Sequence, residues 1–198
     1  FSNGNNTIYY DNGTYNEQVS STLSLTGGNF YWETKIESGI QDSYIGIYKS
    51  DDYTNGWVQD NVHYLYLQNG TKRNGNTSSS YGNSYTNGDI IGCAWNGTTG
   101  TIWFSKNGTW QNSATITEIA NGTTTNSAFT GLSSATDGSA WLTFNSDYNN
   151  GKHSLNFGNG YFGTTAVSSA GINASGNGIF EYDVPTGFTA LSTKGLNL

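Results

Sequence analysis

The sequence predicts an all-β fold, a sandwich of antiparallel strands. Three observations support this class. Segments in which apolar and polar residues alternate recur along the 198 residues and are separated by turn residues. Twelve of the 26 Asn residues precede Gly, about three times the number that random order gives, and Asn-Gly suits the type I′ turn of a tight hairpin. No segment has a convincing helical pattern, and "ATITEIANG" (114–122) is long enough for one helical turn only.

The first clear strand is "FYWETKIES" (30–38), in which polarity alternates at every residue. Trp32 and Ile36 share one face, and Glu33 and Lys35 share the other. This period of two, with a charged face, indicates a half-buried antiparallel strand whose charged side chains face solvent.

The other predicted strands are shorter and follow one another with turn residues between them. "VHYLYLQNG" (62–70) is apolar on both faces, and the polar stretch 69–88 reads as hairpin loops with a short strand near Arg73. The remaining strands are 43–50, 89–96, 101–108, 140–145, 153–158, 178–182 and 187–191.

The stretch "GDIIGCAWNGTTGTIWFSKNGTW" predicts a hairpin at the centre of the fold. Alternation places Ile91, Cys93, Ile102 and Phe104 on the inward face, so we expect the cysteine to be a small buried hydrophobe. Trp103 then points outward, and an exposed tryptophan beside a polar surface is a candidate ligand contact.

Two turns frame this hairpin, at Asn96–Gly100 and at Asn107–Gly108. We expect both to be structural, because Asn and Gly supply the positive φ angles that tight turns need.

Composition and charge exclude several classes of protein. The net charge of −7, with six Lys and one Arg, does not suit the phosphate backbone of nucleic acids. No apolar run reaches the ~18 residues of a membrane span. A single cysteine excludes an intrachain disulfide and four-cysteine zinc sites. His63 and His153 are isolated and read as solvated or strand residues, so we expect no metal ion and no cofactor.

The order of the strand motifs resembles the SPRY domain. The motifs are "GNFYWETKIESG", "SYIGIYKSDD", "YGNSYTNGDIIGCAWNGTTGTIWFSKNGTWQ", "AFTGL", "SLNFG" and "VPTGFTAL", and they span about residues 20 to 191. The opening "FSNGNNT" and the tail "AGINASGNGIFEYDVPTGFTAL" are most similar to the versions found in bacteriophage structural proteins. The resemblance implies a bent antiparallel β-sandwich of the concanavalin type.

We expect a single domain over residues 1–198. The sequence has no Met and no signal-peptide pattern, so we expect it to be a fragment or processed product of a larger protein. Through the resemblance we expect a non-catalytic recognition or structural module of a phage virion protein, of the fibre or decoration type. Its place is then the virion, an extracellular particle assembled in the host cytoplasm. Its partners are other virion proteins and a protein or glycan on a host surface, without membrane insertion.

Two alternatives stay open: a carbohydrate-binding module, and an adaptor of the intracellular SPRY type that binds peptides. An enzyme is the least favoured class. Glycosidases need two carboxylates that flank the bond, but Glu33 and Glu37 alternate with Lys35 as an exposed ion pair would. Asp51 and Asp52 are adjacent, and two ligands are too few for calcium.

We place the ligand-binding surface on loops, because loops on a rigid sandwich are where binding residues concentrate. The predicted surface comprises loops 51–57 and 71–85 with the outward face of the hairpin. Aromatic residues and arginine are favoured anchors of interfaces. The candidate ligand-binding residues are Tyr53, Trp57, Arg73, Tyr81, Tyr85 and, more weakly, Trp103; Tyr81 and Tyr85 could instead only close the edge of the sandwich.

Overall fold

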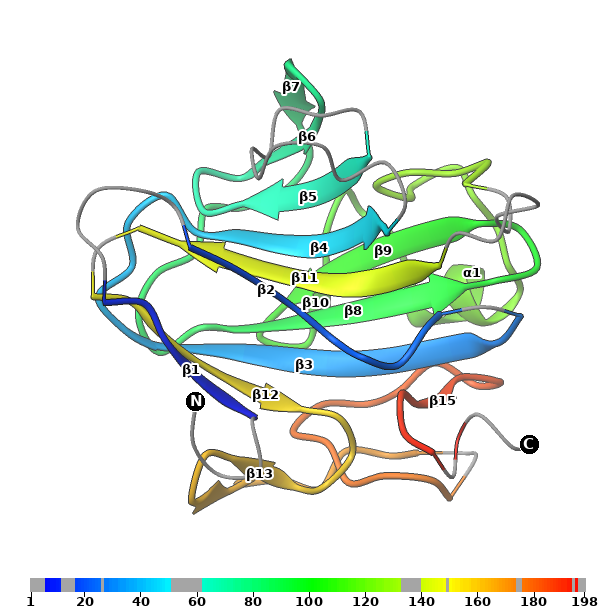
Figure 1. The fold of residues 1–198 in the computed structure, drawn as a ribbon. Helices are drawn as coiled ribbons and strands as arrows, with labels where there is room; N and C mark the ends of the chain where they lie inside the picture. Colours follow the sequence, from blue (N-terminus) through cyan, green and yellow to red (C-terminus); the bar gives the residue numbers. More distant parts are fainter. Residues whose placement is uncertain are drawn as a thin grey trace.

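The structure is a computed structural model, and it describes residues 6–11, 17–25, 27–50, 62–132, 140–148, 150–173, 176–193 and 195. Two sheets stack as a sandwich (Figure 1), which confirms the predicted fold class. All strand pairs are antiparallel except that of β15 with β3.

The first sheet runs in the order β1-β12-β3-β8-β9-β10, and β15 also pairs with β3. Its strands are β1 (Thr7–Tyr9), β3 (Asn29–Ser38), β8 (Ile90–Asn96), β9 (Thr101–Lys106), β10 (Thr109–Trp110), β12 (Lys152–Asn156) and β15 (Thr189–Ala190).

The second sheet runs in the order β2-β11-β4-β5-β6-β7. Its strands are β2 (Glu17–Ser20), β4 (Tyr44–Lys49), β5 (His63–Leu67), β6 (Thr71–Asn74), β7 (Thr77–Ser80) and β11 (Trp141–Asp147). A two-stranded sheet of β13 (Tyr161–Phe162) and β14 (Thr165–Ala166) lies apart from both.

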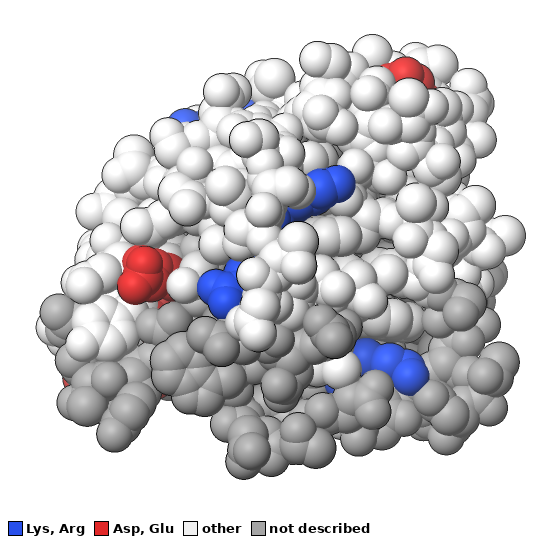
Figure 2. All heavy atoms as spheres, turned by 90° about the horizontal axis from the view of Figure 1, so that it is seen from above, with Lys and Arg blue, Asp and Glu red and all other residues white. Residues whose placement is uncertain are grey.

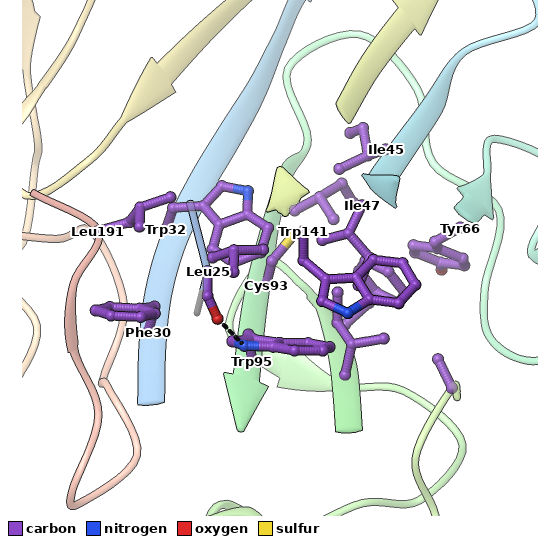
Figure 3. Close-up of a cluster of buried hydrophobic side chains, with 14 of the residues drawn as sticks. Leu25, Phe30, Trp32, Ile45, Ile47, Tyr66, Cys93, Trp95, Trp141 and Leu191 are labelled. Carbon is purple, nitrogen blue, oxygen red and sulfur yellow. Dashed lines mark hydrogen bonds between the residues drawn. The ribbon is translucent and has the colours of Figure 1, made fainter. Parts of the chain in front are cut away.

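The main core lies between the two sheets and is rich in aromatic side chains (Figure 3). Trp95 packs there against Trp141, and its indole Nε1 donates a 2.8 Å hydrogen bond to the carbonyl of Leu25. The inward placement of Ile91, Cys93, Ile102 and Phe104 is confirmed, because all four belong to this core.

A second core covers the outer face of the first sheet. One helical turn, α1 (Ile116–Ala120), begins with a capping box between Thr115 and Glu118 and buries Ile119. This turn and residues 180–190 pack on Tyr31, Ala94 and Trp103.

Residues 178–182 do not form the predicted strand. Only Ile179 makes an isolated bridge, to Asn159. Phe180 instead packs edge to face on Tyr31, with ring centroids 4.9 Å apart. The apolar character of this segment therefore reflects its role as a cover over the first sheet.

The two turns that flank β9 have the geometry that the sequence predicts. Asn107 and Gly108 have φ angles of 49° and 77°, as a type I′ turn requires. In the other turn, Asn96 Oδ1 accepts 3.0 Å hydrogen bonds from the amides of Thr98 and Thr99. Both turns are therefore built from local bonds and backbone angles.

Candidate functional site

Among the described residues of the region predicted to bind a ligand, the hairpin of β6 and β7 is the most exposed part. It projects from the top of the sandwich (Figure 1). Asn74 pairs with Thr77 across a turn in which Gly75 has a φ of 53°, and glycine at the first central position is typical of a type II′ turn. We call Thr71–Ser80 the hairpin surface.

The outer edge of the hairpin surface offers unpaired backbone groups. β7 is the last strand of its sheet, and all four of its residues are exposed. The Tyr81 amide donates to Gly70 O at 3.1 Å, so alternation turns the N–H and C=O groups of Ser78 and Ser80 away from β6. Among the described residues no strand pairs with this edge, which is the arrangement that strand addition uses.

Arg73 is the one predicted contact residue that the structure places on the hairpin surface. It lies on β6, is half-buried, and donates from Nε to Gly75 O at 2.8 Å. Among the described residues, nothing hydrogen-bonds to its terminal guanidinium nitrogens. The side chain is therefore held at its base and retains donors for a ligand.

Lys72 fixes the hairpin to the rest of the domain. Its ammonium donates to the carbonyl of Ala128 at 2.6 Å and lies 5.3 Å from the ring centre of Phe129 and 5.8 Å from that of Tyr81. Burial lowers the pKa of Lys72. These contacts hold the hairpin surface against the rest of the domain.

Few charges lie on the face of the molecule from which the hairpin of β6 and β7 projects. Figure 2 shows this face from above, and most of its described atoms belong to uncharged residues, with the basic and acidic side chains in separate small groups. The hairpin surface therefore offers mainly backbone and hydroxyl groups, and its two charged side chains are Lys72 and Arg73.

Tyr81 and Tyr85 are buried and do not contribute to this surface. The hydroxyl of Tyr81 accepts a 3.1 Å hydrogen bond from the amide of Phe104, and that of Tyr85 donates to the carbonyls of Ser43 and Tyr66 at 2.9 and 3.1 Å. The sequence left two alternatives open for these tyrosines, and their burial favours closure of the sandwich edge, because the stretch after β7 folds back into the core. They close the edge of the sandwich.

Trp103 is also buried, and the prediction that it points outward into solvent is wrong. It does leave the main core, as alternation requires, but it enters the second core with Trp110 and Phe188. The face on which it lies is covered by residues that come more than ten positions later in the chain. Alternation identifies the face but not its cover.

Tyr53 and Trp57, the remaining candidates, lie outside the described residues.

Glu33 is a buried carboxylate that the sequence predicted to face solvent. It is 0% exposed and accepts hydrogen bonds from the backbone amides of Glu181 and Tyr182 at 3.0 Å, and from Tyr31 Oη and Asn156 Nδ2 at 3.1 Å. Burial raises the pKa of this carboxyl to about 7. Glu33 thus ties the C-terminal segment to β3, while the predicted ion pair remains between Lys35 and Glu37 at 3.7 Å.

A second buried polar cluster surrounds His153. Its Nε2 lies 2.9 Å from Asp147 Oδ2 and 3.3 Å from Ser43 Oγ, and its Nδ1 lies 3.3 Å from Tyr10 Oη. Serine and aspartate share one ring nitrogen, so the histidine cannot pass a proton between them as a catalytic triad does. His153 and Asp147 are both fully buried, and the cluster joins the strand ends of both sheets.

The described part of the chain also gives little support for a reactive cysteine or a metal site. Cys93 is buried, as predicted, and burial raises the pKa of its thiol well above the usual value, which disfavours a reactive thiolate. Among the described residues, no three His, Cys, Asp or Glu side chains gather where they could hold a metal ion. In the same residues, no helix is long and apolar enough to cross a membrane.

Comparison with known proteins gives one family and a matching fold. Residues 29–137 match the family described as the SPRY domain. A solved structure, the crystal structure of the SPRY domain of human HERC1, superposes with a TM-score of 0.57 at 18% sequence identity. The match covers 78% of this chain and 89% of that one, so it extends well beyond the central hairpin.

Proposed function

Because the chain belongs to the SPRY domain family, we propose that it is a recognition module that binds an extended segment of a partner protein along the hairpin surface. Domains of this family are in general non-catalytic modules for protein interaction. The observation that carries the proposal is the outer edge of β7, where Ser78 and Ser80 present backbone donors and acceptors next to the held guanidinium of Arg73.

This edge differs from the other sheet edges of the sandwich. Natural proteins protect edges with charges, proline, bulges or short strands. β2 begins with Glu17, and β10 has only two residues. β7 carries only Thr and Ser, so its four residues are available for strand addition.

A protein partner suits the hairpin surface, which has no aromatic residue, better than a glycan. Sugars stack on exposed aromatic rings, but the three aromatic candidates in the described residues, Tyr81, Tyr85 and Trp103, are at most 5% exposed. Hydrogen bonding from strand edge to strand edge needs no aromatic platform.

The parent protein and its location are proposed from the sequence resemblance alone. We propose that the domain belongs to a phage virion protein of the fibre or decoration type and acts in the extracellular particle, in contact with other virion proteins or a host surface. The same surface would serve an intracellular adaptor equally well. The sequence that flanks the domain in its full-length protein distinguishes these settings, because fibre repeats or capsid domains support only the first.

The binding proposal is tested by selecting peptides from a random display library on the immobilised domain. Selected peptides should lose at least tenfold in affinity with Arg73→Ala, as expected for an arginine anchor. Ser78→Pro should act similarly, because proline removes an outward donor and leaves the ladder to β6 intact. Lys152→Ala, which removes a charge on β12, is the matched control.

Peptides that bind all three variants as well as the unmodified domain would place the site elsewhere on the molecule. Loop 51–57, with Tyr53 and Trp57, is the first alternative to test by alanine substitution.

A further inference from the structure

A cavity of about 370 Å³ lies between the two sheets, at the side of the sandwich where the edge strands β1 and β2 lie. In Figure 1, β2 crosses in front of β8 near this side. One part of the lining is apolar: Ile8, Val19, Leu23, Leu155, Phe157 and Leu191. The other part is polar and uncharged: Asn6, Ser20, Ser21, Thr22, Thr143 and Asn145.

Asn145 gives this cavity a specific polar group. The residue is 1% exposed and faces inward from β11, where its Oδ1 accepts a 3.2 Å hydrogen bond from Thr34 Oγ1 on the opposite sheet. Among the described residues, its amide nitrogen has no hydrogen bond. Thr143, two residues earlier on the same wall, is also 1% exposed and its hydroxyl lacks a partner in the described part of the chain.

The Thr143 hydroxyl is buried without a partner among the described residues, and native proteins rarely leave such a group without water or a ligand. Asn145 already uses its oxygen, and its amide nitrogen offers donors only. A ligand that satisfies it must therefore present a hydrogen-bond acceptor, such as a carbonyl or hydroxyl oxygen.

The size and charge of the cavity further limit the class of ligand that it can bind. Its volume equals that of about a dozen water molecules at ~30 Å³ each, and it falls at the lower end of the range of small-molecule sites. None of the described residues that line it is charged, so an ionised ligand would be buried without a counter-ion.

We propose that this cavity binds a small uncharged amphiphile, an apolar chain or ring with one carbonyl or hydroxyl acceptor directed at Asn145. The site is independent of the hairpin surface, because β2 and β7 form opposite edges of the same sheet. If the cavity binds no amphiphile, the protein-recognition proposal therefore stands, and a failure of peptide binding likewise leaves the cavity proposal standing.

The test is a titration of the ¹⁵N-labelled domain with 2-heptanone, followed by the amide shifts of Val19, Leu23, Thr143 and Asn145. We expect saturable shifts confined to the residues around the cavity. Heptanoate, of similar length but ionised, should bind at least tenfold more weakly, because burial of an unpaired charge is unfavourable. A matching rise in melting temperature with 2-heptanone alone is the second measurement.

Three variants locate the site. Val19→Trp fills the cavity from β2 and should abolish the saturable shifts. Ile179→Trp, at a position that is 51% exposed and does not line the cavity, should leave them unchanged. Asn145→Ala should weaken 2-heptanone about tenfold, the contribution of one hydrogen bond.

If Val19→Trp does not fold, Leu23→Trp replaces it as the blocking variant, because Leu23 also lines the cavity. The proposal is overturned if 2-heptanone gives no saturable shift, if blocking variants bind it unchanged, or if heptanoate binds equally well.

Discussion

Two hairpins of this chain are built from similar local signals and have opposite surroundings. The hairpin of β8 and β9 is buried along nearly its whole length, with the sandwich core on one face and the second core on the other. The hairpin of β6 and β7 is half-exposed on one strand and fully exposed on the other. Alternation and turn residues determine that a hairpin forms, whereas segments distant in sequence determine whether it is covered. Among the described residues, the exposed strand β7 therefore offers the more accessible of the two hairpins, and this is where we propose that a partner binds.

The largest effect is expected at Trp103, whose side chain is buried in the second core on the outer face of the covered hairpin. Trp103→Ala should lower the free energy of unfolding by about 3–5 kcal/mol, as for a large aromatic removed from a core. Urea denaturation followed by circular dichroism measures it. A loss below about 1 kcal/mol would mean that residues 180–190 do not cover this face.

The cover over the first sheet should also make stability depend on pH through Glu33. Burial raises the pKa of this carboxyl from 4.5 to about 7, so its contribution to stability is fully present below about pH 4.5 and is lost as the pH rises to about 7. We expect a decrease of about 3 kcal/mol over this range. Glu33→Gln should remove this component, as denaturation series at pH 5 and pH 8 on both proteins will show.

The turn that joins β9 of the covered hairpin to β10 should tolerate a change less well than an open turn does. In Gly108→Val the new Cβ would lie 2.6 Å from the Tyr182 ring, at a φ of 77°, and we expect a loss of about 2 kcal/mol or more. Gly88→Val is the matched control, because Gly88 has a φ of 89° but no atom within 4 Å of a new Cβ. Equal shifts in melting temperature for the two variants would show that Tyr182 does not press on the turn.

Cys93, at the centre of the covered hairpin, should behave as a small core side chain. Cys93→Ala should cost about 1 kcal/mol. A thiol reagent should label the native domain slowly and the urea-unfolded domain rapidly. Rapid labelling of the native protein would contradict the burial of this strand.

The smallest effect on stability belongs to the uncovered hairpin. Arg73→Ala should change the free energy of unfolding by less than about 0.5 kcal/mol, although it weakens a selected peptide. A large loss of stability would mean that Arg73 is chiefly a structural residue through its bond to Gly75. The peptide affinity of Arg73→Lys, which keeps the charge, would then be measured as well.

Much of the fold could be predicted from the sequence, because alternation within one strand depends on neighbouring residues alone. The inward set of Ile91, Cys93, Ile102 and Phe104 was predicted correctly on this basis. β1 and β2 were missed because three- and four-residue edge strands carry too few residues for a period to emerge.

The candidate site was less predictable, because the burial of a side chain on an outer face depends on distant segments. Glu33 and Trp103 were both assigned to the correct face of the first sheet and both wrongly expected to meet solvent. Residues 180–190 cover that face, and no local pattern near Glu33 or Trp103 signals it. Arg73 is half-buried on β6 and lies beside the exposed strand β7, and its role in binding stays a prediction.

The parallel pairing of β15 with β3 has a consequence for synthesis on the ribosome. β3, β8 and β9 emerge long before residues 180–190, so the part of the outer face around Tyr31, on which Phe180 packs, lacks this cover until nearly the whole domain has been translated. β3 must likewise wait for its other neighbour, β12. We therefore expect the domain to complete its folding only after its last segment leaves the exit tunnel, and a stalled chain that ends before residue 177 to display an adhesive aromatic surface.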